Sequence, residues 1–157
     1  MTLRRVITGH DAGNVARAVI DGAVTNLKRG ASGSTVMHVW KSTATPAEIA
    51  TGPFEDTGLE PHVTPPPPGG SRFAVIDFPP GNAGVLHRTE SLDYVVVLAG
   101  EIDMDLDAST VHLRAGDVLV QRGTNHAWCN RGSEAARVAF VLVDAIPLGI
   151  GVPRTTT

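Results

Sequence analysis

The sequence predicts a single all-β domain of short antiparallel strands that form a sandwich or a barrel. Glycine and proline, with 17 and 11 residues of 157, exceed their usual combined share of about 12% and indicate frequent turns. Beyond residue 70, β-rich segments recur at intervals of roughly 8–12 residues, separated by Gly-containing turns. Residues 101–107 (EIDMDLD) alternate strictly between acidic and apolar side chains, which is typical of a strand with one buried face.

The composition narrows the possible functions. Apolar residues make up 42% and charged residues 18%, so the chain can build a core and does not resemble a disordered protein. The net charge of −3 and the few aromatic residues (two Trp, one Tyr, four Phe) argue against a nucleic-acid partner. We expect a cytoplasmic protein with no membrane partner, because a signal peptide and a run of about 20 apolar residues are both lacking. The single cysteine, Cys129, excludes an internal disulfide.

The first 70 residues are expected to belong to the same domain, because they are too sparse in apolar residues for a core of their own. Residues 14–20 and 35–41 contain β-branched side chains and predict two strands. Residues 45–52 (TPAEIATG) predict one short helix, since Thr suits the N-cap, Pro the first helical position and Glu the first turn. Residues 61–70 (PHVTPPPPGG) predict an extended spacer.

The rest of the chain predicts a series of strands in residues 71–78, 93–99, 101–107, 111–113, 117–121, 126–130 and 137–144. The acidic face of residues 101–107 consists of Asp103, Asp105 and Asp107. The glycine and the closing glutamate of an EF-hand calcium loop are missing at the required spacing, so we expect a solvated strand face.

Polar residues with catalytic potential lie in two separate segments. In the first (HRTESLD, residues 87–93), His87 and Thr89 share one face of an extended chain, and Asp93 opens the next strand. In the second (GDVLVQRGTNHAWCN, residues 116–130), His126, Trp128 and Asn130 share a face after a turn at Gly123. If the two segments pair across a barrel, His87, Asp93 and His126 converge inside it.

These two segments resemble the two motifs of the cupin family. The first has Gly81, His87, Thr89, Asp93 and Gly100 at cupin spacing, and the second has Gly116, Asp117, Gly123, His126 and Asn130. The stretches RRVITGHD and HRTESLDY are also similar to small single-domain cupins of natural-product pathways. The resemblance implies a cupin jelly-roll β-barrel over residues 1–157, with an extended N-terminal segment and spacer (1–70), one short helix and a barrel core (71–144).

The chain departs from the metal-binding cupin pattern at two positions. Thr89 stands where that pattern has its second histidine, and Asp93 stands where it has a glutamate. The loop of the second motif is one residue short, with Gln121 near the usual proline. The remaining set, His87, Asp93 and His126, matches the ligands of a facial triad, so the resemblance implies one divalent metal, Fe, Zn, Mn or Ni.

Structural roles remain open for the same residues. His87 and His126 are equally compatible with interior histidines that make ordinary hydrogen bonds, and Asp93 with a turn that bonds its own backbone. Asn130 is expected to shape the turn before Gly132, and Cys129 to be a buried thiol pointing opposite to His126. The remaining histidines show no paired spacing and are expected to be structural or exposed: His10, His38, His62 and His112.

Three functions follow, in order of preference. The first is a metal-dependent oxidoreductase, isomerase or lyase in which Thr89, Gln121 and Trp128 bind the substrate. The second is a metal-free enzyme in which His126 is the general acid or base, held by Asp93. The third is a binding module without catalysis.

The ligand is expected to be a small, largely apolar organic molecule. Few basic residues fall near the motifs, since Arg88 faces away from His87 and Arg122 sits on a turn, so a phosphate group is not favoured. The cupin resemblance and the N-terminal segment 4–20, which can cover the barrel or join a partner's sheet, favour a homodimer.

Overall fold

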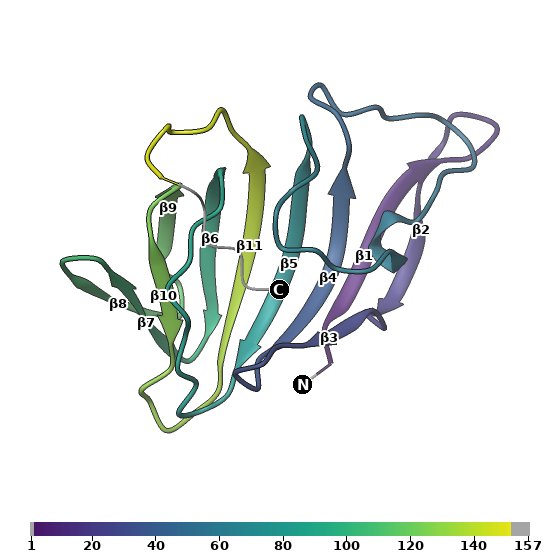
Figure 1. Ribbon diagram of the computed structural model, residues 1–157. Coiled ribbons are helices and arrows are strands. Elements are labelled where there is room, and N and C mark those ends of the chain that lie inside the picture. Colours follow the sequence, from purple (N-terminus) through teal and green to yellow (C-terminus); the bar gives the residue numbers. More distant parts are fainter. Residues whose placement is uncertain (1, 152–157) are drawn as a thin grey trace.

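A computed structural model describes residues 2–151, and it is almost entirely β (Figure 1). In chain order the strands are β1 (Arg4–His10), β2 (Ala16–Ala23), β3 (Leu27–Arg29), β4 (Thr35–Ser42), β5 (Ser71–Phe78), β6 (Ser91–Ala99), β7 (Glu101–Leu106), β8 (Thr110–Arg114), β9 (Val118–Arg122), β10 (His126–Cys129) and β11 (Ala136–Asp144). A single 3-10 turn, η1 (Thr57–Leu59), precedes β5.

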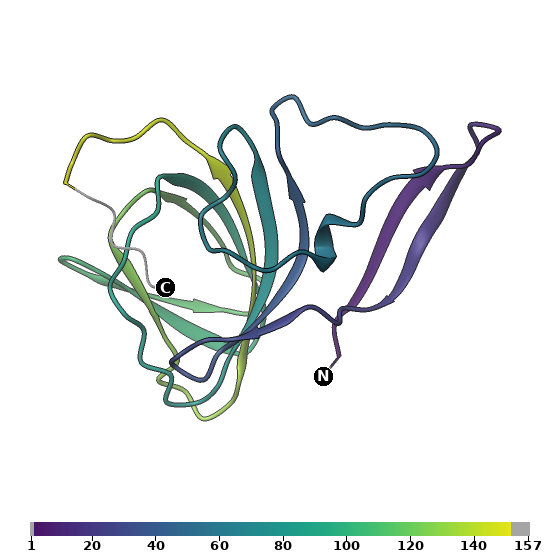
Figure 2. The same cartoon turned by 45° about the vertical axis from the view of Figure 1, so that its right-hand side comes forward.

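Two antiparallel sheets form a barrel that is open at one end (Figure 2). The larger sheet has the order β3-β4-β5-β11-β6-β9, and the smaller one has the order β10-β7-β8. Alternate residues of β11 point inward, and Val138, Phe140 and Leu142 meet Ile102 and Met104 of the small sheet in one buried cluster. The period-two pattern of the sequence therefore places the core between the two sheets.

The N-terminal strands β1 and β2 form a separate hairpin that projects from the barrel (Figures 1 and 2). At its base, Leu3 and Val24 pack with Met37, Val39 and Val75 on the outer face of β4 and β5. This second apolar cluster attaches the base of the hairpin to the barrel, whereas most residues of β1 and β2 stay exposed and do not cover it.

The strands from residue 71 onward agree with the sequence prediction within a few residues, and β5 agrees at both ends. Strands β1 and β3 were not predicted, and each forms a hairpin with the next strand of the chain, across turns at residues 11–15 and 30–34. The short helix is present but misplaced: residues 45–52 are irregular, and the 3-10 turn lies at Thr57–Leu59.

The reason for the misplaced helix is a lack of buried surface. The side chain of Ile49, the central apolar residue of segment 45–52, is 90% exposed, so a helix there would bury nothing. At the 3-10 turn, in contrast, the Asp56 carboxylate accepts a hydrogen bond from Gly58 N and also binds the buried Arg5 guanidinium. Within residues 2–151, the structure has no helix long and apolar enough to cross a membrane.

Candidate functional site in the barrel

The two polar segments meet through an isolated antiparallel bridge between His87 and His126. The backbone N–H of each histidine donates to the carbonyl oxygen of the other, and both N···O distances are 2.9 Å. The imidazole rings lie side by side, with centroids 4.4 Å apart. The convergence that the sequence predicted for these two histidines is confirmed.

Each imidazole is held in one tautomer by a nearby carbonyl group. Nδ1 of His87 lies 2.8 Å from the Val85 carbonyl oxygen, and Nδ1 of His126 lies 3.0 Å from that of Thr124. Because a carbonyl oxygen can only accept, the proton resides on Nδ1 and each Nε2 keeps a free lone pair. Burial, and to a lesser degree the neighbouring His87, lower the pKa of His126 to about 4, so His126 is a neutral base at pH 7.

Asp93 lies at the end of a chain of buried hydroxyl groups. Thr89 Oγ1 is 2.7 Å from Ser91 Oγ, and Ser91 Oγ donates to Asp93 Oδ1 at 2.6 Å. The other carboxylate oxygen accepts from Gln121 Nε2 at 3.0 Å. Since the Ser91 proton is used toward Asp93, Thr89 is the donor to Ser91, and the chain runs from the pocket wall at Thr89 to the carboxylate.

The Asp93 carboxyl group is only 4% exposed, and this burial raises its pKa to about 6, although the bond from Ser91 acts in the opposite direction. A carboxyl group with a pKa close to neutrality can both give and take a proton at physiological pH. The Asp93 side chain makes no hydrogen bond to His126 in the described part of the chain. The predicted pairing, in which Asp93 holds His126, is therefore wrong, because Thr124 holds the imidazole.

These groups face a cavity of about 260 Å³ inside the barrel. Its wall is mainly apolar, and the functional residues at one end are His87, Thr89, Asp93, His126 and Trp128. Asn82 also lines the cavity: its Nδ2 donates to the Trp128 carbonyl oxygen, while its buried Oδ1 has no hydrogen-bond partner. This free acceptor is available to a hydroxyl or N–H group of a ligand.

Most of the predicted site residues lie at the cavity or directly behind its wall, and further residues join them. Gln121 is buried behind Asp93 and positions the carboxylate, whereas the sequence analysis placed it among the substrate-binding residues. Asn130 is fully buried and accepts from Gly132 N, which confirms its role in the turn. Ser91 and Asn82 were missed, and for Ser91 the alternation of Thr89, Ser91 and Asp93 on one face was the available signal.

The two histidines fit a metal ion better than the aspartate does. A free Nε2 opposite an Nδ1–H that donates to a carbonyl oxygen is the usual arrangement of a metal-binding histidine. Both oxygens of Asp93 are already hydrogen-bonded, and no group of three or more His, Cys, Asp or Glu side chains within residues 2–151 is placed to hold a metal. The residues thus fit two ligands of the expected triad, and the third is not in place.

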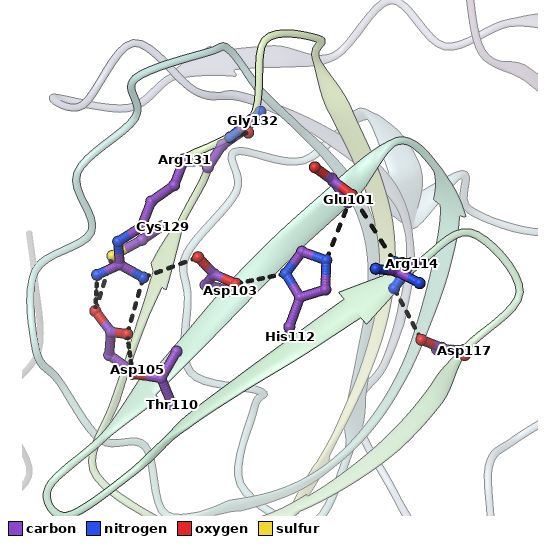
Figure 3. Close-up of polar contacts among 11 residues, drawn as sticks. Glu101, Asp103, Asp105, Thr110, His112, Arg114, Asp117, Cys129, Arg131 and Gly132 are labelled. Atoms are coloured by element: carbon purple, nitrogen blue, oxygen red, sulfur yellow. Dashed lines mark hydrogen bonds and ion pairs between the residues drawn. The ribbon is translucent and has the colours of Figure 1, made fainter.

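The acidic strand face is a network of ion pairs on the outside of the small sheet (Figure 3). The Arg131 guanidinium bridges Asp103 and Asp105, and the His112 ring joins Asp103 to Glu101. Asp103 and Asp105 therefore each have a cationic partner, while Asp107 accepts a hydrogen bond from the Asn125 side chain. Cys129 also lies here: its Sγ donates to Asp105 and points opposite to His126, as expected from the strand alternation.

Comparison with known proteins agrees with this geometry. The family model described as Cupin domain matches residues 74–143, which contain both motifs. A phomopsin biosynthesis cluster protein of Diaporthe leptostromiformis is 40% identical over 157 residues, covering 95% of this chain and 82% of that protein. The chain belongs to the cupin family.

Two further matches concern a sequence relative and a solved structure. A cupin-domain-containing oxidoreductase of Neurospora crassa, srdB, is 31% identical over 150 residues, covering 92% of this cupin and 74% of that protein. The cupin domain of Schizosaccharomyces pombe Cnp3 aligns with a TM-score of 0.54 at 14% identity, over 92% of this chain and 89% of that chain, and shows a shared fold alone. The predicted resemblance to small cupins of natural-product pathways is confirmed.

Proposed function

We propose that this cupin is an enzyme that moves protons on a small, largely apolar organic molecule inside its barrel. The observation that carries the proposal is the placement of two separated proton-transfer groups, His126 and Asp93, on the wall of one mainly apolar cavity. The cavity volume of about 260 Å³ is just below the usual range of roughly 300–1,000 Å³ for ligand pockets, so it suits a small substrate. The relatives named as oxidoreductases support an enzymatic role.

The chemistry follows from the state of each group. The neutral Nε2 of His126 is free to take a proton from an acidic C–H or O–H group of the substrate. Asp93, whose pKa burial raises to about 6, supplies or receives the second proton through Ser91 and Thr89, the latter of which lines the cavity. Removal of one proton and return of another to a different atom of the substrate is an isomerisation. Delivery of the second proton to a leaving group, which then departs, is an elimination, and the two groups suit either reaction.

A metal-dependent oxidoreductase is the second candidate, and the two histidines favour it. Their Nε2 atoms are free and their Nδ1 atoms are fixed by carbonyl groups, so His87 and His126 would hold a divalent ion, and Asp93 would become the third ligand only by leaving Ser91 or Gln121. The metal would supply Lewis acidity or a redox centre. In that enzyme Thr89 and Trp128 would contact the substrate, and Gln121 would orient Asp93.

Elemental mass spectrometry of the purified protein separates the two candidates, with His87→Ala and His126→Ala variants measured in parallel. If the protein is a metal-free proton-transfer enzyme, the amounts of Fe, Zn, Mn and Ni are far below stoichiometric. Hydrogen–deuterium exchange into bound carbonyl compounds then requires His126 and continues in the presence of a chelator. A stoichiometric metal that is lost from both variants, with activity that a chelator abolishes, would establish the second candidate and reject the first.

A further inference from the structure

The cavity wall also carries basic groups far from Asp93. Lys28 and Arg29 of the edge strand β3 line it, together with His62 from the proline-rich spacer; the Lys28 side chain faces inward beside Val36, whereas the Arg29 guanidinium donates to Thr35 on the outer face. The cavity wall within residues 2–151 contains a single acidic side chain, Asp93, on β6, four strands away from β3 in the sheet order. This finding corrects the expectation that basic residues are scarce near the ligand, because β3 was not recognised as a strand in the sequence.

One deeply buried cation, Arg72, lies behind His62, together with a buried histidine, His38, whose pKa burial lowers below its ordinary value. Arg72 of β5 is 5% exposed; its Nε donates to the Pro65 carbonyl oxygen at 3.3 Å, and its Nη1 has no partner. His38 of β4 is fully buried, with both ring nitrogens unpartnered, and its ring meets that of His62 edge-on at 5.5 Å. Arg72 makes no ion pair with a carboxylate among the described residues, which is unusual for a buried guanidinium.

The electrostatic environment of His62 agrees with this arrangement. Burial is the main cause that lowers its pKa to about 3, and the positive charges of Arg72, His38 and Lys28 lower it further. Glu60 attracts Arg72 and His38, but no carboxylate acts on His62 itself. An anionic group placed there would meet Lys28 directly and would offset part of the field of Arg72.

We propose that the ligand of this cupin is an amphipathic organic acid whose carboxylate binds at Lys28 and His62. Between Lys28 of β3 and Asp93 of β6, the wall contains Val36, Ile76, Phe78, Phe140 and Leu142 of the intervening strands, which suit an aromatic or short alkyl body. The bound carboxylate fixes the orientation, so that the far end of the ligand reaches His126 and Asp93. The inference names the substrate class of the proposed enzyme and rests on that function only for the reacting end.

Isothermal titration calorimetry with arylalkanoates tests the proposal. The probes are benzoate, phenylacetate and 3-phenylpropanoate, each compared with its uncharged primary amide. We expect the wild-type protein to bind at least one acid about tenfold more tightly than its amide, and the variant Lys28→Gln to lose roughly five- to tenfold in acid affinity with the amide unchanged. The control variant Arg114→Gln/Arg122→Gln removes two exposed charges outside the cavity wall and should alter neither.

The arms of this experiment separate the carboxylate site from the proposed proton-transfer function. If the preference for acids survives His126→Ala and chelator treatment, the carboxylate binds at β3 whether or not the protein catalyses proton transfer. A preference that disappears in His126→Ala and persists in Lys28→Gln places the anion at the histidine pair and overturns the proposal. Equal affinity for acids and amides, no acid binding up to about 10 mM, or displacement by inorganic phosphate at equal affinity would overturn it as well.

Discussion

His87 and His126 pair through their backbones as well as lying ring to ring: two N–H···O bonds of 2.9 Å join them, and their ring centroids are 4.4 Å apart. The backbone bridge fixes both imidazoles on the cavity wall before any ligand binds, which lowers the entropic cost of assembling the site. The bridge in turn depends on how the segment before His87 lies against β10.

Gly84 should be essential for that contact. A Cβ at this position would lie 2.4 Å from the carbonyl oxygen and 2.7 Å from the nitrogen of Trp128, so Gly84→Ala must push the segment away from β10. We expect a loss of about 2 kcal/mol or more in the free energy of unfolding, measured by urea denaturation. Gly22→Ala, where a Cβ meets nothing within 4 Å, is the matched control, and an equal effect of both changes would contradict this prediction.

Asp93→Asn should stabilise the protein at alkaline pH and abolish its activity. The folded state raises the pKa of Asp93 to about 6, so it binds the proton more tightly than the unfolded chain, and wild-type stability falls as the pH rises from about 4 to about 6. The Asp93→Asn variant carries no titrating group here, so its stability does not fall over this pH range. After the Gln121 side-chain amide flips, its Oε1 atom, which has no partner in the wild type, can accept a hydrogen bond from the new Asn side chain.

We expect Asp93→Asn to be roughly 1–3 kcal/mol more stable than the wild type at about pH 8, with little difference at about pH 4. Chemical denaturation at both pH values measures the effect, and Asp107→Asn, on the exposed strand face, serves as the control. If Asp93→Asn is less stable than the wild type at about pH 8, neighbouring groups stabilise the buried Asp93 carboxylate, and the prediction is wrong.

His62 should make the fold sensitive to acid. Burial holds its pKa at about 3, below the ordinary value near 6.5, so the stability it contributes is fully present above about pH 6.5 and declines as the pH falls toward 3. His62→Gln removes the uptake of one proton on unfolding and should flatten the slope of unfolding free energy against pH by up to about 1.4 kcal/mol per pH unit near pH 5. His10→Gln, at an exposed position, should leave the slope unchanged.

Two adjacent arginines of β1 should contribute very differently to stability. Arg5 is 8% exposed and binds the Asp56 carboxylate with two hydrogen bonds and the Val39 carbonyl with a third, whereas Arg4 makes its pair with Asp21 in solvent. Arg5→Met leaves the Asp56 carboxylate without its cationic partner and should lower the free energy of unfolding by about 3 kcal/mol. Arg4→Met should lower it by less than about 1 kcal/mol. Similar costs in denaturation experiments would show that burial does not distinguish the two pairs.

The predicted homodimer has a candidate surface in the outer face of β6 and β9. Here Tyr94 pairs across the strands with Val120, and Val96 with Val118, and all four side chains are exposed. Exposed apolar patches of this kind mark association sites. Light scattering should give a dimer for the wild type and a monomer for Val118→Glu/Val120→Glu, while Arg4→Met remains dimeric. A monomeric wild type at micromolar concentration would refute the prediction.

Strand positions and the polar residues of the two motifs were predictable because they depend on local patterns. Period-two alternation located β7, β-rich segments between turn residues located β5 and β11, and the spacing of His87, Thr89, Asp93 and His126 placed them on one wall of a barrel. Strands β1 and β3 form hairpins with β2 and β4, but most of their side chains are exposed, and the cluster of Leu3 and Val24 that anchors the first hairpin exists only in the folded chain. The same reason explains the misplaced helix, because burial at Asp56 and not local propensity decides where the turn forms.

The sequence by itself determined the all-β class, the family and the two histidines, since alternation, turn residues and motif spacing are properties of the chain order. Tertiary structure decided the partners of each group. It assigned Ser91 and Gln121 to Asp93 and the Thr124 carbonyl to His126, and it brought Lys28 and Arg29 to the cavity. Hydrogen bonds and charge interactions act over a few ångströms, and residues far apart in sequence come within that distance only when the barrel closes.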